Sequence, residues 1–310
     1  MDVPLTLPTP QVKRADLAWL SNTLGRAGRR VGRPGPIWLG GLAYSFLSFG
    51  WTFGLVLAVP FVSRLDPRQE WLVRLGRATG GLLGLVTSNN TTLILLMLPI
   101  ILAFARLAGG LTRLAPPEVW DRVARSKNRS RPVLRDAWRH GRSVSISTGL
   151  LWLQVVLMMA LLAATLILPA WGVLRIFGFE EWSTLTAVLS GAAAAMTLVY
   201  GFLLGILFQL ALHSLMHNRR GIGSALLHAW RLARNDPGAT IRATAMDAGF
   251  QLVKWIVLVA LGIAESLAQG LAPLVVMAVL LVYAGFGCIR CLYWSEVYEE
   301  FGGQSTAPEA

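Results

Sequence analysis

The sequence carries little charge and almost no cysteine or histidine for its length. Of its 310 residues, 14% are charged and 55% are hydrophobic, while two are cysteine and four are histidine. Soluble domains carry about 25% charged residues, so the deficit argues against a soluble globular chain. The two cysteines, Cys288 and Cys291, allow no disulfide framework beyond that single pair.

Signals for processing, lipid attachment and catalysis are also missing. The N-terminus is polar and interrupted by proline, so we expect no cleavable signal peptide. Residue 2 is aspartate rather than the glycine that myristoylation requires. We find no nucleotide-binding loop, metal triad, paired carboxylates or nucleophile motif, and therefore predict no catalytic residue, metal site or cofactor.

Long apolar runs are what the sequence has in abundance. A helix of about 20 apolar residues crosses the hydrocarbon layer, and in lipid the backbone must satisfy its own hydrogen bonds. We therefore predict an all-α, polytopic integral membrane protein with about six transmembrane helices plus amphipathic interfacial helices. The predicted spans are residues 38–61, 92–111, 149–171, 185–210, 248–267 and 271–294. They form a membrane domain over residues 38–297, between a basic N-terminal segment, 1–37, and a short C-terminal tail, 298–310.

Basic residues predict the orientation. The formal net charge is +12, and most basic residues lie between the apolar runs. This placement favours the positive-inside rule and attraction to anionic lipid head groups over nucleic-acid binding. The N-terminal segment and the loops before the third and fifth spans are basic, so we predict that they and both termini are cytoplasmic, in a bacterial inner membrane. The loop between the first two spans disagrees, because it is basic on the predicted outer side.

A short pattern, L-x-x-A-W-R-x-x-R, occurs twice, at residues 134–142 and 226–234. Leu, Ala and Trp share one helix face and the arginines lie on the polar side. We predict two helices on the cytoplasmic membrane surface, or alternatively a small cytoplasmic cap. Asp236 is predicted to cap the next helix, with Pro237 in its first position. The candidate interfacial residues are Trp138, Arg139, Arg142, Trp230, Arg231 and Arg234.

Duplication is one explanation of this repeat, and chance similarity between two basic amphipathic helices is the other. A duplication would make the third and fourth spans equivalent to the fifth and sixth. It would also place Trp138 and Trp230 at equivalent sites, each wedged where its helix meets the following span.

The A-W-R-x-x-R helices and the aromatic ending at residues 293–298, Y-W-S-E-V-Y, resemble a broad group of uncharacterised six-span bacterial membrane families. That group includes the membrane domain of glycerophosphoryl diester phosphodiesterases. The resemblance implies a six-span membrane domain. The catalytic domain of those enzymes is a separate soluble barrel, for which this chain has no room, so no catalytic residue is carried over.

Polar residues within the apolar spans are candidates for function, because an ionisable group in lipid often marks a transport path. Lys254 and Glu265 lie in the same span, about 16 Å apart at helical rise, so they cannot pair directly. Lys254 is near the predicted cytoplasmic end, where it could extend to the head groups. The candidate intramembrane polar residues are Lys254, Glu265, Gln209, Gln154, Asn89 and Asn90.

Two further motifs have weaker chemical meaning. Cys288 and Cys291 show the C-x-x-C spacing of redox and metal sites, but packing of small residues between helices is the favoured interpretation. His213 and His217 are spaced so that both imidazoles could face one metal. The favoured interpretation is contact with lipid or a loop.

These observations favour a non-enzymatic bacterial inner-membrane protein that acts as a scaffold or partner-binding subunit. Its expected partners are membrane lipids with anionic head groups and a protein, but not nucleic acid. The alternative is a transporter or lipid-handling protein with polar groups inside the helix bundle, and an enzyme acting on lipid is a third reading. A polar cavity lined by the candidate residues would favour transport, whereas a filled bundle would favour the scaffold.

The predicted topology can be tested with reporter fusions after Pro116, Gly178, Gly221 and the C-terminus. We expect cytoplasmic signals at every site except Gly178, which should report the periplasm, because arginine-rich segments stay inside. A periplasmic signal from the Gly221 fusion would overturn the predicted orientation.

Overall fold

The structure is a computed structural model that describes residues 16–32, 37–48, 91–124, 131–176, 184–267 and 272–303. Among these residues every regular element is an α-helix and no strand occurs, which confirms the predicted all-α class. The helices of the described residues are α1 (Leu17–Val31), α2 (Trp38–Leu47), α5 (Thr91–Leu114), α6 (Pro117–Ala124), α7 (Arg131–Gly141), α8 (Ser145–Ile176), α9 (Thr184–His217), α10 (Ile222–Asn235), α11 (Pro237–Leu267) and α12 (Ala272–Glu300).

Every predicted span overlaps one of these helices. Helix α2 covers the start of the first span, and the remainder of that span lies outside the described residues. Helix α12 continues to Glu300 and Tyr298 is fully buried, so the predicted tail at 298–310 begins too early. Helix α11 starts at Pro237, before the predicted fifth span at 248, because its first turns are polar and lack the apolar signal of a span.

The start of α11 is determined locally, as predicted. The Asp236 Oδ1 accepts a hydrogen bond from the backbone N–H of Ala239 at 2.8 Å. A carboxylate at this position satisfies one of the helix's unpaired N-terminal donors, and Pro237 has no N–H to leave unsatisfied. These contacts confirm the predicted cap and let α11 follow α10 almost directly.

Three of the described helices are long and apolar enough to cross a membrane. The qualifying segments are Val199–His217 in α9, Pro237–Leu261 in α11 and Pro273–Glu300 in α12. Shorter apolar helical segments occur at Trp38–Leu47 and Ser145–Met158. The structure is therefore compatible with a membrane protein, and the count of six spans stays a prediction.

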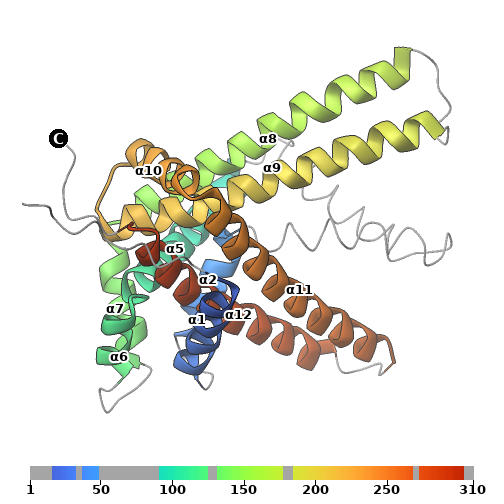
Figure 1. The fold of residues 1–310 in the computed structure, drawn as a ribbon. Coiled ribbons are helices and arrows are strands. Elements are labelled where there is room, and N and C mark those ends of the chain that lie inside the picture. Colours follow the sequence, from blue (N-terminus) through green and yellow to red (C-terminus); the bar gives the residue numbers. More distant parts are fainter. Residues whose placement is uncertain are drawn as a thin grey trace, which may run out of the picture.

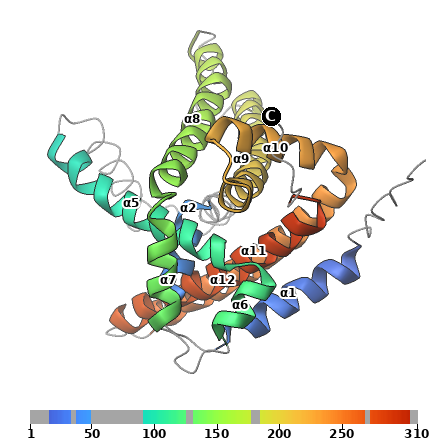
Figure 2. The same ribbon diagram turned by 90° about the vertical axis from the view of Figure 1, so that its left-hand side faces the viewer.

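The long helices form two arms that diverge from a shared base. Helices α8 and α9 pack side by side in one arm, and α11 and α12 pack in the other (Figure 1). The shorter helices α6, α7 and α10 lie toward the base, on the left of Figure 1. In the turned view, α1 lies close to α6 (Figure 2), and the Trp120 indole N–H donates to the Arg30 carbonyl oxygen at 3.2 Å.

Helix α2 sits at the centre of the base, where it packs closely on α12. A Cβ added to Gly41 would overlap the carbonyl oxygen of Ala284, and one added to Gly287 would overlap the carbonyl oxygen of Gly41. Cys288 is fully buried in this contact, with its Sγ 3.7 Å from the Ile37 carbonyl oxygen. Only glycine allows the two backbones to approach this closely.

The two cysteines are free thiols buried at helix contacts. Cys291 is fully buried, and its Sγ lies 3.7 Å from the Thr112 Oγ1 on α5. Both side chains fill space between helices, which supports the packing interpretation of the C-x-x-C spacing.

The close contact between α2 and α12 makes a specific prediction. Gly41→Ala should destabilise the protein by about 1–3 kcal/mol or more, since its methyl group must displace backbone atoms. Gly205→Ala on α9 is the matched control, because its Cβ would meet no atom within 4 Å. The control should be neutral or slightly stabilising, since alanine favours the helix. Thermal unfolding in detergent measures both, and equal melting temperatures for the two variants would contradict the packing.

Candidate functional site

A buried ion pair joins α11 to α12. The Arg290 Nε lies 2.8 Å and 2.9 Å from the two carboxylate oxygens of Asp247, and its Nη2 lies 2.6 Å from Oδ2. Asp247 is 5% exposed and Arg290 is 7% exposed. The Trp294 indole N–H donates a further hydrogen bond to Asp247 Oδ2 at 3.1 Å. The paired geometry of the guanidinium group satisfies the carboxylate on both oxygens.

The same arginine also reaches α2. Its Nη1 donates to the Ser48 carbonyl oxygen at 3.0 Å and to the Ser48 Oγ at 2.7 Å. Ser48 directly follows the last residue of α2, where carbonyl groups lack helical partners. Each guanidinium nitrogen therefore has an acceptor, and the pair ties three helices together. Buried charges paired in this way favour a fixed arrangement. If either partner is lost, the other stays as an unpaired charge in a low-dielectric interior, which is costly.

Further polar side chains surround the ion pair. The Tyr44 hydroxyl donates to Gln209 Oε1, and both residues are fully buried. Lys254 is 1% exposed, and its ammonium nitrogen lies 4.8 Å from the ring centroid of Tyr283. Asp247 and Arg290 both act electrostatically on Tyr44 and on Lys254. We refer to Ser48, Tyr44, Gln209, Asp247, Lys254, Arg290 and Trp294 as the buried polar cluster.

The structure brings some of the predicted polar residues together and separates others. Gln209 and Lys254 belong to the buried polar cluster, so the expectation that Lys254 extends to the head groups is wrong. Gln154 is exposed on α8 and lies apart. Glu265 is in the last turn of α11, with its side chain outside the described residues, and Asn89 and Asn90 are also outside them.

The sequence analysis missed the ion pair itself. Arg290 lies inside the predicted sixth span, and an ionisable residue in a span is a functional candidate by default. That signal could have identified Arg290. Asp247 was harder to find, because it precedes the predicted fifth span by one residue and resembles a loop residue.

The two repeat helices share a burial pattern. Ala137 and Ala229 are fully buried, whereas Trp138 is 39% exposed and Trp230 is 53% exposed. The wedge predicted for these tryptophans is therefore wrong, because the small alanine makes the close contact and the next residue turns away from it. The repeat arginines Arg139, Arg142, Arg231 and Arg234 are all exposed.

The packing partners of the repeat helices are the preceding long helices. Helix α7 packs mainly on α5, and α10 packs mainly on α9. Arg106 of α5 donates from Nε to the Trp138 carbonyl oxygen at 2.7 Å, and its guanidinium carbon lies 3.9 Å from the centroid of that indole. Arg106 therefore connects α5 to α7. Duplication of the whole unit stays a prediction.

The histidines contact an aromatic ring. His213 and His217 both stack on Tyr298, with ring centroids 5.9 Å away in each case. His213 is fully buried, so the predicted contact with lipid or a loop is wrong for it. Within the described residues, no group of three or more His, Cys, Asp or Glu side chains is placed to hold a metal ion.

The N-terminal basic segment is anchored to α12. Arg26 lies 2.7 Å from a carboxylate oxygen of Glu296, and Arg30 bonds the other oxygen of the same carboxylate. Leu20 and Ala27 of α1 are fully buried in the shared hydrophobic core. Helix α1 therefore packs as part of the bundle, although it lies in the segment that the sequence separates from the membrane domain.

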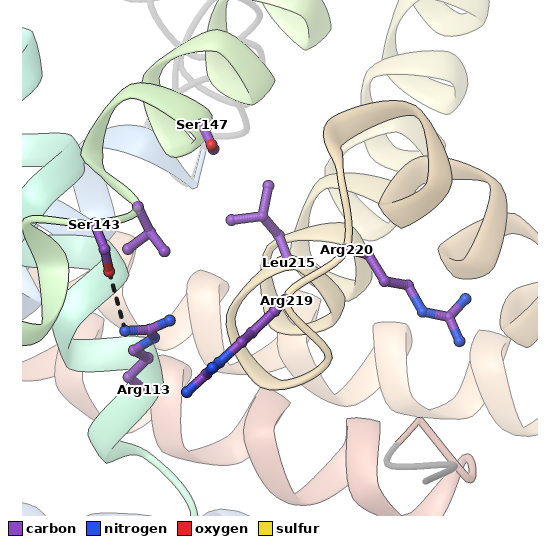
Figure 3. Close-up of a pocket in the computed structure, with 7 residues that line it drawn as sticks. Arg113, Ser143, Ser147, Leu215, Arg219 and Arg220 are labelled. Atoms are coloured by element: carbon purple, nitrogen blue, oxygen red, sulfur yellow. Dashed lines mark hydrogen bonds between the residues drawn. The ribbon is translucent and has the colours of Figure 1, made fainter. Parts of the chain in front are cut away.

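A cavity of about 390 Å³ lies where the ends of α5, α8 and α9 meet (Figure 3). Arg113 donates from Nη1 to the His140 carbonyl oxygen at 3.2 Å and to the Ser143 Oγ at 3.3 Å. Burial, and then the nearby charge of Arg219, lower the pKa of Arg113. The cavity is lined by Arg113, Ser143, Val144, Ser147, Leu215, Arg219 and Arg220.

Comparisons with protein family models, curated proteins and solved structures found no match. Function is therefore inferred from the residues of this chain alone. Among the described residues, the buried polar cluster and the cavity lined by Arg113 and Arg219 are two places where the fold concentrates polar side chains.

The ion pair makes a prediction about stability. Asp247→Asn leaves Arg290 buried without its counter-charge and should destabilise the protein by about 3–5 kcal/mol. Glu118→Gln removes an exposed carboxylate and is the matched control. The double variant Asp247→Leu/Arg290→Met should recover most of the loss, because no charge stays buried. Thermal unfolding in detergent measures all three, and a double variant as unstable as Asp247→Asn would contradict this account.

Proposed function

We propose that this protein is a non-enzymatic scaffold or partner-binding subunit of the bacterial inner membrane, with six spans and cytoplasmic termini. The hydrogen bonding of the Asp247–Arg290 ion pair, in which every guanidinium nitrogen and both carboxylate oxygens have a partner, is the observation that carries the proposal. A coupling residue of a transporter must exchange partners during its cycle. Arg290, in contrast, is hydrogen-bonded to both Asp247 and Ser48 in one fixed arrangement. Such a pair suits a bundle that keeps one shape while its outer surfaces bind lipid and protein.

Exposed apolar side chains support the membrane location. Large apolar residues recur on one face of α8 and are about half exposed or more, which is costly in water and favourable against lipid chains. Helix α11 shows a similar set. The exposed residues are Ile146, Leu150, Leu153, Leu157 and Leu161 on α8, and Leu252, Val253, Ile256, Val259 and Ile263 on α11.

The repeat helices support contact with anionic head groups. Each presents an exposed indole beside exposed arginines, a combination that favours the membrane–water interface. The resemblance to the membrane domain of glycerophosphoryl diester phosphodiesterases and the duplication that relates α7–α9 to α10–α12 belong to the same proposal. In this account the basic surface is cytoplasmic and orients the protein.

A transporter is the second candidate, and Lys254 is the observation in its favour. Its side chain is buried on the α11 face that also carries Asp247 and Gln251. The Oε1 atom of Gln251 has no hydrogen-bond partner among the described residues. A buried ammonium group on the same helix face as an unsatisfied amide oxygen is the arrangement expected of a site for a polar substrate or ion.

Flux through reconstituted protein separates the two candidates. We expect proteoliposomes loaded with a pH-sensitive dye to show no proton or potassium flux above protein-free liposomes, for the wild type and for Lys254→Met alike. Val253→Met, at the exposed neighbouring position, controls for insertion and amount of protein. Flux that requires Lys254 but tolerates Val253→Met would replace the scaffold with the transporter.

A further inference from the structure

The cavity between α5, α8 and α9 concentrates positive charge without a negative partner. The guanidinium groups of Arg113 and Arg219 point toward each other across it (Figure 3). Among the residues that the structure describes, no acidic side chain lines the cavity. In the described part of the chain, none of Arg113, Arg219 and Arg220 forms an ion pair. Two like charges held this close favour an anion between them.

A second arginine-lined cavity shows the contrast. It measures about 350 Å³ and is lined by Arg26, Arg29, Arg30, Trp120 and Asp121. Its positive charge is compensated within the protein, because Arg30 lies 3.7 Å from Asp121 and also bonds Glu296. The first cavity therefore carries positive charge that the protein does not compensate, and its arginine content alone does not explain this difference.

Positive charge near helix ends has a simpler explanation, which covers only part of the arrangement. Arg113 lies in the last turn of α5 and Arg219 follows the end of α9, where cations offset the helix dipole. That effect does not explain why the two side chains point into the same cavity. Arg219 also has a backbone φ of 51°, unusual for a residue other than glycine, so its placement is not the relaxed one.

The neutral groups of the cavity complete an anion site. Ser143 already bonds Arg113, and Ser147 turns its hydroxyl toward the same space (Figure 3). These serines lie at the start of α8, where unpaired backbone N–H groups favour negative charge. The volume falls in the range of small-molecule sites, about 300–1,000 Å³, and so exceeds what a bare inorganic ion needs.

Apolar surface next to the cavity indicates the source of the anion. Val144 and Leu215 form part of its wall. Ile146, 67% exposed, begins the apolar face of α8 beside Ser147. A molecule with a phosphate group and an acyl chain could place the phosphate between the arginines and the chain along α8.

We propose that Arg113, Arg219 and Ser147 bind the phosphate group of an anionic membrane lipid. The site rests on the proposed membrane function, which it deepens by naming the lipid-binding residues. Arginine provides charge-assisted hydrogen bonds to phosphate oxygens, and the Ser147 hydroxyl donates to one that remains. Ser143 accepts from Arg113 and donates to the His140 carbonyl oxygen, so it positions Arg113 at the site. The bound head group would link α5, α8 and α9 at the base of the bundle.

The test uses the full chain purified in a neutral detergent and three additives: phosphatidylglycerol, phosphatidylcholine and inorganic phosphate. Native mass spectrometry counts retained lipid, and thermal unfolding reports the stabilisation that each additive gives. Phosphatidylglycerol should bind and stabilise the wild type, whereas phosphatidylcholine should have little effect. The double variant Arg113→Gln/Arg219→Gln should lose about tenfold or more in lipid affinity, since each charged hydrogen bond contributes strongly to binding.

Matched controls separate the cavity from general surface charge. Arg29→Gln/Arg135→Gln removes the same charge from exposed positions outside the candidate interfacial residues and should change the affinity less than threefold. Ser147→Asp keeps both cavity arginines and places a carboxylate beside them. It should abolish the response to phosphatidylglycerol while leaving the lipid-free protein at least as stable as the wild type, which makes the test independent of folding defects.

Each outcome decides the assignment. Equal losses from the cavity and surface double variants would overturn the site in favour of non-specific attraction. An equally strong effect of inorganic phosphate would overturn lipid as the source and assign the site to soluble phosphate compounds. Full stabilisation of the Ser147→Asp variant by phosphatidylglycerol would also overturn the assignment of the site to the cavity. Failure of the proposed scaffold would show separately, as Lys254-dependent flux with the lipid site unchanged.

Discussion

Two opposite charges, Asp247 and Arg290, stay inside an apolar bundle because each satisfies the other. The cost of removing a single charge from water is several kcal/mol, so the two helices that carry them can separate only with a large penalty. Arg290 has one nitrogen left over, and the end of α2 supplies its acceptors at Ser48. The close glycine contact between α2 and α12 places that acceptor within reach. The ion pair therefore fixes how α2, α11 and α12 meet at the base.

This constraint also shapes what the rest of the molecule can do. With α2, α11 and α12 held together, binding is left to the outer surfaces and to the cavity at the ends of α5, α8 and α9. The exposed apolar faces suit lipid chains, and the exposed arginines and indoles suit the head-group layer. Lys254 lies against the aromatic rings of Trp255 and Tyr283. A static core with an adaptable periphery is the physical meaning of the proposed scaffold.

Local features of the fold could be predicted from the sequence, because they depend on nearby residues. Apolar length predicts the helices, and the Asp236–Pro237 pair predicts the start of α11. The repeat pattern predicts α7 and α10, but not which face of each is buried. Helix periodicity alone places alanine and tryptophan on one apolar edge, and only the packing partner shows that the alanine makes the contact.

Tertiary features could not be predicted from the sequence, because they depend on residues that are far apart in the chain. The partner of Arg290 lies on another helix, and a single sequence contains no information about which helices are neighbours. The same holds for Arg113 and Arg219, whose shared cavity is assembled from three helix ends far apart in the chain. Arg106 illustrates the point, since its contact with α7 cannot be read from its place in the sequence. Gln209 and Lys254 were named as candidates from the sequence, whereas Asp247 and Arg290 were not, and no pairing was predictable.

The most direct test of the central claim is the distance between α11 and α12 in a lipid bilayer. Spin labels attached to cysteines introduced at the exposed positions Val253 and Val276 report this distance. It is measured by pulsed electron–electron double resonance on the protein in nanodiscs. The account predicts one narrow distribution that does not change with pH or salt, and a broader one when Arg290 is replaced by glutamine. Two populations in the otherwise native protein, or no broadening in the Arg290→Gln variant, would contradict a core held by the ion pair.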